Sequence, residues 1–480
     1  MGSNVEWVEL VVIIGAPPSG LVRVVEYEDA SGRASDTSGF FVHRADRRPC
    51  AYLDAPMSAV VRSLLPDTSS VDDDGMLVIG GCRMDELAAA HGTPVFVYDE
   101  AQLRDRCREA VEAFGAGRAI YATKAFLCRA MARLAYEEGM LLDVASGGEL
   151  HVALAAGVPA SSCTLHGNNK SPEELRHAVD AGVRYIVVDS FDELDRLDAL
   201  HRTSGRAPDV LLRITPGVHA HTHEYIATGQ DDSKFGFNLG NGDAGRAVER
   251  AGRAASVNLV GLHCHIGSNV FAADSFGRAA EVMAAFAQPL DLPELVLGGG
   301  LGVAYVEGEE APTIAVWAKV VLDACRSLGV RSNVSVEPGR AIVAAAAVTL
   351  YTVGTIKTIP GVRTYVAVDG GMSDNPRPVL YGSGYEAFLP RQVGAARHRR
   401  ARVVGKHCES GDVLLLDARL PEDIVVGDLL AVPVTGAYGH SMGSNYNKVP
   451  RPPIVFVRDG DARVVVRRET YDDLLSTDVG

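Results

Sequence analysis

Eight short runs of β-branched and other apolar residues recur along the middle of the chain, and most are followed by a loop and a helical pattern. This alternation is typical of parallel βα units. Eight such units predict an α/β fold built on a TIM-like (β/α)8 barrel. The runs are AIYA from residue 119, LLDVA from 141, CTLHG from 163, YIVVD from 185, VLLRI from 210, LVGLHCHI from 259, ELVLGG from 294 and NVSVEP from 333.

Two of the predicted helices begin with a serine that is followed three residues later by a glutamate, at Ser171 and Glu174 and at Ser190 and Glu193. In a capping box the serine side chain accepts the backbone N–H of the glutamate, whose carboxylate accepts the N–H of the serine. We therefore expect a capping box at both helix starts.

A second part of the chain is rich in predicted strands. After about residue 345 the helical patterns stop, and strand-like runs alternate with turns, including an Asp459-Gly460 pair typical of a hairpin. We expect the barrel at residues 99–345 and a C-terminal β-rich domain, a Greek-key barrel or sandwich, at 346–480. Residues 76–98 contain the run VFVY and are expected to pair with that domain, and residues 1–75 to form an N-terminal extension that partly joins it.

Charge and composition exclude several classes of protein. The chain has 46 Lys and Arg against 61 Asp and Glu, a net charge of −15, which repels nucleic acids and anionic membranes. Its longest uncharged stretch, residues 341–356, is shorter than the roughly 20 apolar residues that cross a bilayer, and the acidic N-terminus does not resemble a signal peptide. The eight cysteines are scattered without a CxxC pair, so we expect a cytoplasmic protein.

Polar residues and glycines stand where the predicted barrel strands end. In a (β/α)8 barrel these ends converge on one face, where the chemistry takes place. We therefore expect the following residues to share one site: Lys124, Asp143, His166, Asp189, Arg213, His265, Gly298, Gly299, Gly300, Gly302 and Glu337.

This set has the chemistry that pyridoxal phosphate requires. Lys124 can form a Schiff base with the cofactor, and Glu337 can keep the ring nitrogen protonated through a charge-assisted hydrogen bond. His265 can cover the face of the ring. The GGGLG loop at 298–302 lets backbone N–H groups approach a phosphate, and it does not match the dinucleotide pattern GxGxxG.

Two further motifs have less specific interpretations. The alternating histidines His219, His221 and His223, and likewise His263 and His265, could suggest a metal, but no carboxylate or cysteine accompanies them at a standard ligand spacing, so we expect no metal site. The run CESGD at 408–412 taken alone is compatible with an ordinary β-turn.

Ten motifs, in order, closely resemble the diaminopimelate decarboxylase family, whose members are fold-type-III, alanine-racemase-like pyridoxal phosphate enzymes. The resemblance covers roughly residues 57–480. Related ornithine and arginine decarboxylases share several of the motifs, but the DGGMSDNPRP and CESGD forms resemble the diaminopimelate branch. The motifs are YATKAF, LDVASGGEL, LHGNNKS, RITPGVHAHTHEYIATGQDDSKFGF, GLHCHIGSN, LGGGLG, VEPGR, VDGGMSDNPRPVLYG, GKHCESGD and TGAYGHSMGSNYN.

The resemblance implies decarboxylation of meso-2,6-diaminopimelate to L-lysine and CO2 by a homodimer with shared active sites. It implies that Cys408 donates a proton, and that Glu409 reads the distal ammonium of the substrate, both in the site of the partner subunit. The cofactor would be held by Lys124, Asp143, Arg213, His265, Ser268, Gly298, Gly299, Gly300, Glu337 and Tyr438, and the substrate by Arg340, Arg377, Tyr381, Glu409 and Tyr438.

Three features depart from the family pattern: Asn269 stands where glutamine is more usual, Thr215 stands where asparagine is, and residues 1–56 have no counterpart. The shorter side chain of Asn269 leaves open a same-fold decarboxylase that acts on another diamino acid or on a carrier-bound amino acid. A catalytically inactive binding or regulatory homologue is a further alternative, although Lys124, His265, Glu337 and Cys408 are all present. A racemase of this fold would usually place an arginine at Glu337.

Overall fold

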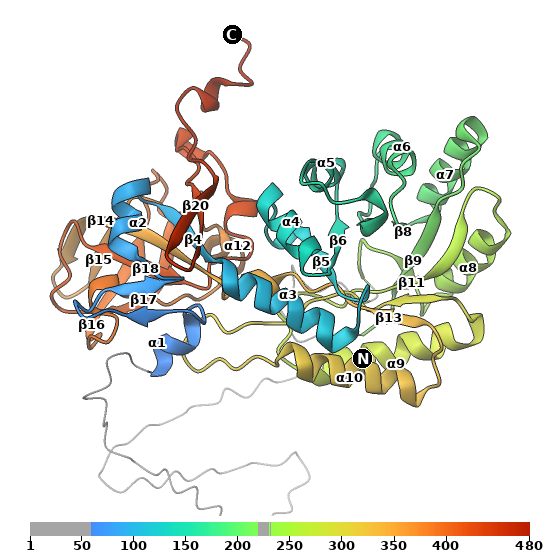
Figure 1. Cartoon of the computed structure of the whole chain (residues 1–480), viewed down its shortest axis with the longest axis horizontal. Coiled ribbons are helices and arrows are strands. Elements are labelled where there is room, and N and C mark those ends of the chain that lie inside the picture. The colour runs from blue at the N-terminus through green and yellow to red at the C-terminus, as the bar shows by residue number, and fades with distance from the viewer. Residues whose placement is uncertain (1–58, 219–229, 231) are drawn as a thin grey trace, which may run out of the picture. The chain divides into compact units, whose positions relative to one another are not determined.

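The computed structural model describes residues 59–218, 230 and 232–480, and eight parallel strands form the centre of this part of the chain (Figure 1). Their order in the sheet follows the order in the sequence. A parallel bridge between Ala119 and Val336 joins the first strand region to the last and closes the barrel. The prediction of eight βα units is confirmed. The strands are β5 (Ile120–Ala122), β6 (Leu141–Val144), β7 (Cys163–Leu165), β8 (Tyr185–Val188), β9 (Asp209–Thr215), β11 (Asn258–His263), β12 (Glu294–Val296) and β13 (Asn333–Ser335).

Helices surround these strands (Figure 1). The last of them, α11, has only four residues, and the longer helix that precedes the barrel, α3 (Glu100–Phe114), packs against α10, α4 and α11. Trp317 of α10 is fully buried, with its ring 5.1 Å from Phe114 of α3 and 5.6 Å from Phe276 of α9. The helices after the strands are α4 (Arg129–Glu137), α5 (Gly147–Ala155), α6 (Pro172–Ala181), α7 (Phe191–Ser204), α8 (Asp243–Arg253), α9 (Ala273–Ala287), α10 (Ile314–Ser327) and α11 (Arg340–Val343).

Only one of the two predicted capping boxes is complete. At α6, Ser171 and Glu174 make both reciprocal hydrogen bonds. At α7, Ser190 accepts the N–H of Glu193, but the Glu193 carboxylate accepts the N–H of Asp189 and the ammonium of buried Lys170 instead of the N–H of Ser190. The second prediction was therefore wrong, because a buried cation from the preceding loop draws the glutamate away.

The C-terminal part forms a mixed sheet in the order β17-β16-β15-β14-β4-β19-β20, with β18 also paired to β14. Strand β4 lies between β14, to which it is antiparallel, and β19, to which it is parallel. Asp459 and Gly460 both have positive φ at the turn between β19 and β20, as a tight hairpin requires. The strands are β4 (Val95–Asp99), β14 (Ala347–Ile359), β15 (Arg363–Val368), β16 (Arg399–Val404), β17 (Val413–Leu420), β18 (Leu429–Pro433), β19 (Ile454–Arg458) and β20 (Asp461–Val466).

A small separate sheet of three strands precedes β4 and shares a hydrophobic core with the mixed sheet. Leu77 and Ile79 of this small sheet are in the same buried cluster as Val97 and Val348 of the mixed sheet. Residues 1–58 of the predicted extension lie outside the described residues. The elements are α1 (Ala59–Leu64), β1 (Ser70–Val71), β2 (Leu77–Ile79), β3 (Cys82–Arg83) and α2 (Met84–His91).

The expectation that helices stop near residue 345 needs one correction. A short helix, α12 (Arg377–Tyr381), lies between β15 and β16, with proline at Pro376 and Pro378 around its start and Gly382 in the left-handed conformation at its end. It carries two of the predicted substrate residues. No helix within the described ranges is long and apolar enough to span a membrane.

Candidate active site

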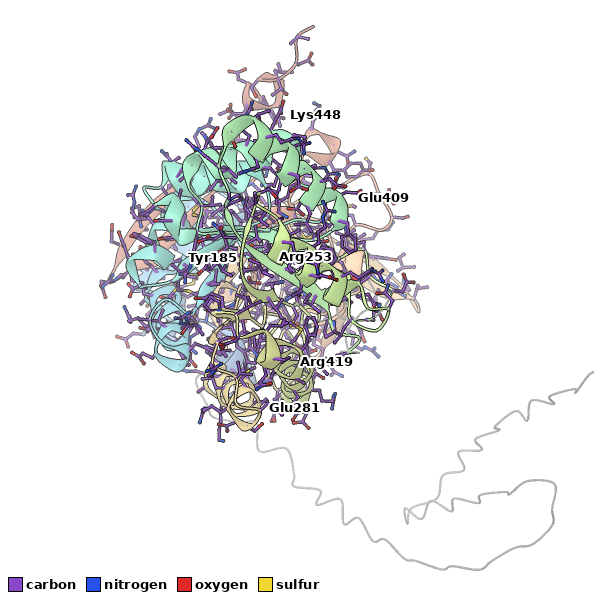
Figure 2. All side chains as sticks on the ribbon, turned by 90° about the vertical axis from the view of Figure 1, so that its right-hand side faces the viewer. Tyr185, Arg253, Glu281, Glu409, Arg419 and Lys448 are labelled. Atoms are coloured by element: carbon purple, nitrogen blue, oxygen red, sulfur yellow. The ribbon has the colours of Figure 1, made fainter. Side chains whose placement is uncertain are left out.

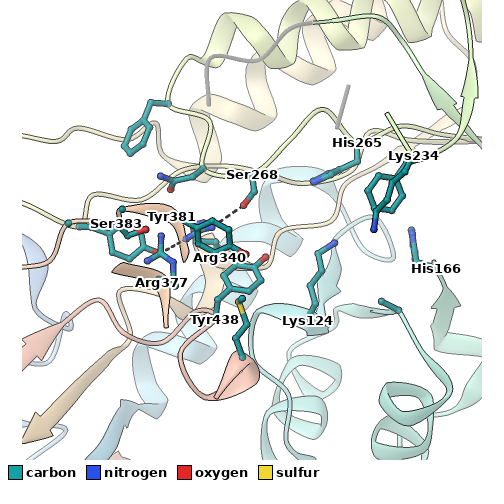
Figure 3. Close-up of a pocket in the computed structure, with 18 of the residues that line it drawn as sticks. Lys124, His166, Lys234, His265, Ser268, Arg340, Arg377, Tyr381, Ser383 and Tyr438 are labelled. Carbon is teal, nitrogen blue, oxygen red and sulfur yellow. Dashed lines mark hydrogen bonds between the residues drawn. The ribbon is translucent and has the colours of Figure 1, made fainter. Parts of the chain in front are cut away.

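A cavity of about 720 Å³ lies where the C-terminal ends of the barrel strands meet loops of the mixed-sheet part (Figure 3). Figure 3 shows Lys124 and His166 on one side, Arg377 and Tyr381 on the other, and Arg340 and Tyr438 between them. Nine of the predicted site residues line this cavity: Lys124, His166, Arg213, His265, Ser268, Arg340, Arg377, Tyr381 and Tyr438.

Lys124 reaches into the cavity from a 3-10 turn directly after β5. Its side chain is 44% exposed, and its Nζ lies 3.9 Å from Oδ2 of Asp143, which is buried at the end of β6. Enclosure by the barrel lowers the pKa of Lys124, but the surrounding negative charge, first that of Asp143, outweighs this effect and leaves the pKa above its ordinary value. The result is an accessible amine beside one buried carboxylate.

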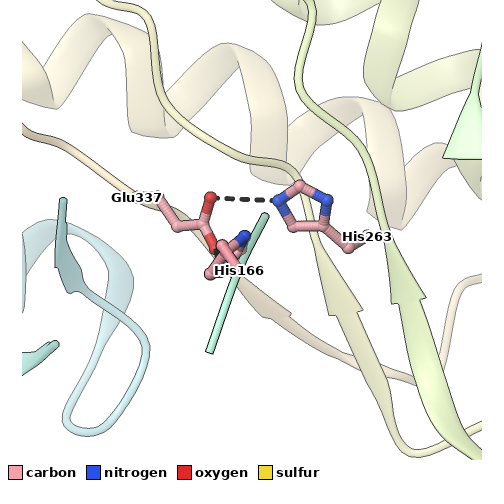
Figure 4. Close-up of side chains that lie close together, drawn as sticks. All are labelled: His166, His263 and Glu337. Carbon is pink, nitrogen blue, oxygen red and sulfur yellow. Dashed lines mark hydrogen bonds and ion pairs between the residues drawn. The ribbon is translucent and has the colours of Figure 1, made fainter. Parts of the chain in front are cut away.

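Glu337 is buried just after β13 and lies between two imidazoles (Figure 4). Its Oε2 is 3.0 Å from Nε2 of His263, and its Oε1 is 3.1 Å from Nε2 of His166. Burial opposes ionisation, but the two histidines outweigh it and hold the pKa of the Glu337 carboxyl well below its usual range. Glu337 therefore remains a carboxylate deep in the barrel.

The glycine loop after β12 leaves no room for side chains. A Cβ on Gly299 would lie 1.9 Å from the carbonyl oxygen of Glu337, and a Cβ on Gly300, whose φ is +111°, would lie 2.1 Å from the carbonyl oxygen of Gly267. Both glycines line a small pocket of about 40 Å³ together with Ser268 and Arg340. A pocket with exposed backbone N–H groups, a hydroxyl and a guanidinium is suited to bind a phosphate group.

His265 lies beside this loop and lines both pockets. The backbone N–H of Gly299 donates to its Nδ1 at 3.2 Å, which places the ring hydrogen on Nε2. Burial, with the nearby positive charges of Lys124 and Arg213, holds the pKa of His265 well below its usual range. A neutral imidazole in this position can cover the face of an aromatic ring.

Arg213 lies near the C-terminal end of β9 and is buried against Phe235, with its guanidinium carbon 4.2 Å from the ring centroid. Burial lowers the pKa of Arg213 from its ordinary value, and Asp189, whose Oδ1 lies 3.7 Å from the Arg213 Nε, opposes this shift. Asp189 contacts Arg213 from the side away from the cavity and is not among the described residues that line it.

Arg340 and Arg377 are the most distinctive pair in the cavity. They are 6% and 3% exposed, and within residues 59–218 and 232–480 neither forms an ion pair with a carboxylate. Arg377 donates from Nη1 to the Tyr385 hydroxyl at 2.6 Å, and Arg340 donates from Nη2 to Ser268 Oγ at 3.0 Å. The Nε of each arginine is buried without a hydrogen-bond partner in the same ranges. Two buried cations without anions form a binding site for negative groups.

Cys408 and Glu409 do not join the cavity of their own chain. Both are exposed in the loop between β16 and β17, Figure 2 shows Glu409 at the periphery, and neither is among the described residues that line the cavity. Asp412, at the end of the same CESGD run, is buried and accepts the backbone N–H groups of Met372 and His407.

Several cavity residues had no assigned role in the sequence analysis. Tyr305 lies between the two arginines, with the Arg377 guanidinium 4.1 Å and the Arg340 guanidinium 5.6 Å from its ring centroid. No periodicity distinguishes this loop residue. His263 was considered only as a metal ligand, although it stands two residues before His265 in the HCH motif.

The two departures from the family pattern lie in different environments. Asn269 lines the cavity, has a positive φ of 59°, and has a buried Oδ1 without a hydrogen-bond partner in the described part of the chain. Thr215 is buried behind the cavity and donates to the carbonyl of Phe235. His219, His221 and His223 lie outside the described residues.

Comparisons with known proteins agree with this geometry. Residues 100–344 match the family described as "Pyridoxal-dependent decarboxylase, pyridoxal binding domain". The chain is 48% identical over 430 residues to the diaminopimelate decarboxylase of Bacillus subtilis (strain 168), covering 86% of this chain and 98% of the relative. It is 50% identical over 414 residues to that of Actinosynnema pretiosum subsp. auranticum, covering 84% and 93%.

Solved structures are similar over most of the chain. The diaminopimelate decarboxylase of M. jannaschii in co-complex with L-lysine has a TM-score of 0.81 and 33% identity, covering 86% of this chain and 98% of that one. The enzyme of Helicobacter pylori complexed with L-lysine has a TM-score of 0.76 and 32% identity, covering 82% and 98%.

Proposed function

Because the chain belongs to the diaminopimelate decarboxylases, within the pyridoxal-dependent decarboxylases, we propose that it converts meso-2,6-diaminopimelate to L-lysine and carbon dioxide. The observation that carries this proposal is the pair of buried arginines without carboxylate partners, Arg340 and Arg377, in the same cavity as Lys124. A diaminopimelate molecule brings two carboxylates, one to be lost and one to be recognised. The second is the natural partner of a buried guanidinium.

The residues at the Lys124 end fit pyridoxal phosphate. Lys124 would hold the cofactor covalently, Glu337 would hold a proton at its ring nitrogen, and His265 would cover one face of the ring. The narrow glycine loop and Ser268 would bind the phosphate. When bound, pyridoxal phosphate supplies an electron sink for the pair of electrons left by departing CO2.

Further cofactor contacts follow from the walls of the cavity. Asp143 would keep Lys124 oriented. Arg213 would add positive charge near the cofactor, away from the substrate clamp formed by Arg340, Arg377 and Tyr381. Tyr438 lines both pockets and stacks under the Arg340 guanidinium at 4.9 Å, so it would serve the phosphate end and the substrate end together.

Arg377 and Tyr381 would bind the distal carboxylate of the substrate from one short helix, α12. A planar guanidinium whose orientation is set by Tyr385 can donate two parallel hydrogen bonds to a carboxylate. Ornithine and lysine lack this second carboxylate, so the clamp would discriminate against them.

We also propose that the active enzyme is a homodimer with shared sites. Cys408 and Glu409 are exposed and lie outside their own cavity, which supports a role in the cavity of a partner. Large apolar side chains are exposed on two elements that contact each other, Leu380 of α12 at 46% and Leu416 of β17 at 67%. Such exposed side chains suit a protein interface. Mixing a Lys124→Ala chain with a Cys408→Ala chain should recover part of the activity.

The chain boundaries and the cellular location remain part of the proposal. We propose a cofactor-binding barrel at 99–345, flanked by 76–98, and a β-rich domain at 346–480, with 1–75 as an extension. The seven cysteines within the described residues all have free thiols, which supports a reducing compartment such as the cytoplasm.

The deciding experiment measures CO2 release by the cofactor-loaded protein from meso-diaminopimelate, LL-diaminopimelate, ornithine, lysine and arginine, with identification of the product. We expect release from the meso isomer alone and lysine as the product. Release from another amino acid, with none from the meso isomer, would overturn the substrate assignment and retain the decarboxylase chemistry. Absence of cofactor binding would overturn both.

A further inference from the structure

The HCH motif at the end of β11 places two imidazoles at different depths of the barrel. His265 lines the cavity, whereas His263, two residues earlier, is only 1% exposed and is not among the described residues that line the cavity. His263 is the last residue of β11, whereas His265 lies in the loop that follows. His263 is therefore buried beneath the part of the cavity wall that His265 forms.

His263 contacts the acid that we assign to the ring nitrogen of the cofactor. Its Nε2 lies 3.0 Å from Oε2 of Glu337, in hydrogen-bond geometry (Figure 4). The other carboxylate oxygen, Oε1, has no hydrogen-bond partner among the described residues, although the Nε2 of His166 is 3.1 Å away. Oε2 of Glu337 is thus hydrogen-bonded to His263, whereas Oε1 lies beside His166 without hydrogen-bond geometry.

The environment of His263 defines its proton position. Its Nδ1 is buried and has no hydrogen-bond partner in the described ranges, so the ring hydrogen belongs on Nε2, where the carboxylate accepts it. Burial lowers the pKa of His263, with Glu337 opposing the shift. A neutral donor fixes the carboxylate without neutralising its charge.

We propose that His263 is a positioning residue, whose Nε2–H holds Oε2 of Glu337 and leaves Oε1 for the ring nitrogen of pyridoxal phosphate, so that this nitrogen stays protonated. The inference rests on the proposed role of Glu337. It also gives the HCH motif a function other than metal binding, although the donor atoms of His166, His263 and Glu337 lie within 4.8 Å of one another. A nitrogen that carries a hydrogen cannot bind a metal ion.

Two polar substitutions of His263 separate this role from simple packing. The amide nitrogen of glutamine can occupy the position of the histidine Nε2, so His263→Gln keeps the donor to Glu337. Asparagine is shorter and reaches only the position of Nδ1, so His263→Asn removes the donor and retains a polar side chain. The melting temperatures of both variants would be measured with bound cofactor.

The direct measurement is the ¹⁵N NMR shift of the ring nitrogen in pyridoxal phosphate labelled at that atom and bound to the protein. We expect the wild type and His263→Gln to give the shift of a protonated ring nitrogen. In His263→Asn the protonation equilibrium should move roughly ten- to a hundredfold toward the unprotonated form, which corresponds to the loss of one hydrogen bond to a charged group. An unchanged shift in His263→Asn would overturn the inference.

Two further measurements keep the result decisive. In Glu337→Gln the ¹⁵N shift of the ring nitrogen should also move. If it does not move, the proposed role of Glu337 fails together with the inference. If the shift responds to Glu337→Gln but not to His263→Asn, the inference alone is refuted. Should His263→Asn fail to bind the cofactor, ¹⁵N-histidine NMR of the wild type decides. A neutral ring with the hydrogen on Nε2 supports the inference, and a hydrogen on Nδ1 overturns it.

Discussion

Replacing Arg377 by glutamine is the most informative test of the substrate clamp. The Arg377 guanidinium is 3% exposed and has no carboxylate partner in the described chain, so a bound substrate carboxylate would be its main counter-charge. Removing one partner of a buried, hydrogen-bonded charge pair costs roughly 2–5 kcal/mol. Because about 1.4 kcal/mol corresponds to a tenfold change in rate, Arg377→Gln should lower kcat/KM for meso-diaminopimelate roughly thirtyfold to several-thousandfold.

Tyr385→Phe is the matched control, since it removes only the hydroxyl to which Arg377 donates at 2.6 Å. Because the donor is a charged guanidinium, losing this single bond should cost about 1.5–3 kcal/mol, roughly ten- to a hundredfold in kcat/KM. Neither change should alter the dissociation constant of pyridoxal phosphate, because Arg377 lies across the cavity from Lys124 (Figure 3). Steady-state CO2 release and a cofactor titration measure the two quantities. If Arg377→Gln weakens the cofactor as much as it lowers kcat/KM, the clamp assignment is refuted.

Three further outcomes are expected. Lys124→Ala should abolish both turnover and the visible absorbance of bound cofactor, and an unchanged spectrum would contradict its role. Gly299→Ala, whose Cβ would lie 1.9 Å from a carbonyl oxygen, should destabilise the fold by about 1–3 kcal/mol or more in calorimetry, whereas Gly302→Ala, at 3.1 Å, should cost less. Burial raises the pKa of Asp374 to about 7. The folded protein therefore keeps a proton there that the unfolded chain releases near pH 4. As the pH rises from about 4 to about 7, the free energy of unfolding should fall by about 1.4 kcal/mol per pH unit. Asp374→Asn should remove this part of the slope in denaturant titrations, and an identical slope would contradict the assignment.

The barrel could be predicted from the sequence because its strands are buried on both faces. Such strands are short, continuous apolar runs, and the eight runs correspond to β5 through β13, with the extra two-residue strand β10 (Phe237–Asn238) paired to β9. The position of β4 between β14 and β19 was harder to predict, because about 250 residues separate β4 from β14 in the chain. Local pattern indicated a strand there but did not specify its two neighbours.

The strand-end rule explains why much of the candidate site was predictable. Lys124, Asp143 and Glu337 lie at or just after the C-terminal ends of barrel strands, so their convergence depends only on the fold. The pairing of His263 with Glu337 and of Tyr305 with two arginines depends on side-chain packing between distant segments, which no periodicity encodes. Residues 219–229 carry three of the motif histidines and lie outside the described structure.

One buried carboxylate, that of Asp412, holds both the loop before Arg377 and the loop that carries Cys408 and Glu409. Asp412 accepts the backbone N–H of Met372, five residues before Arg377, at 2.7 Å, and that of His407, next to Cys408, at 2.9 Å. Both bonds end on the same side chain, which is 3% exposed. A displacement of either loop therefore leaves a buried carboxylate incompletely hydrogen-bonded, which is costly. In the proposed dimer, the loop before Arg377 and the loop of Cys408 and Glu409 are thus held by one side chain, so Asp412 would couple substrate recognition to the assembly of the shared site.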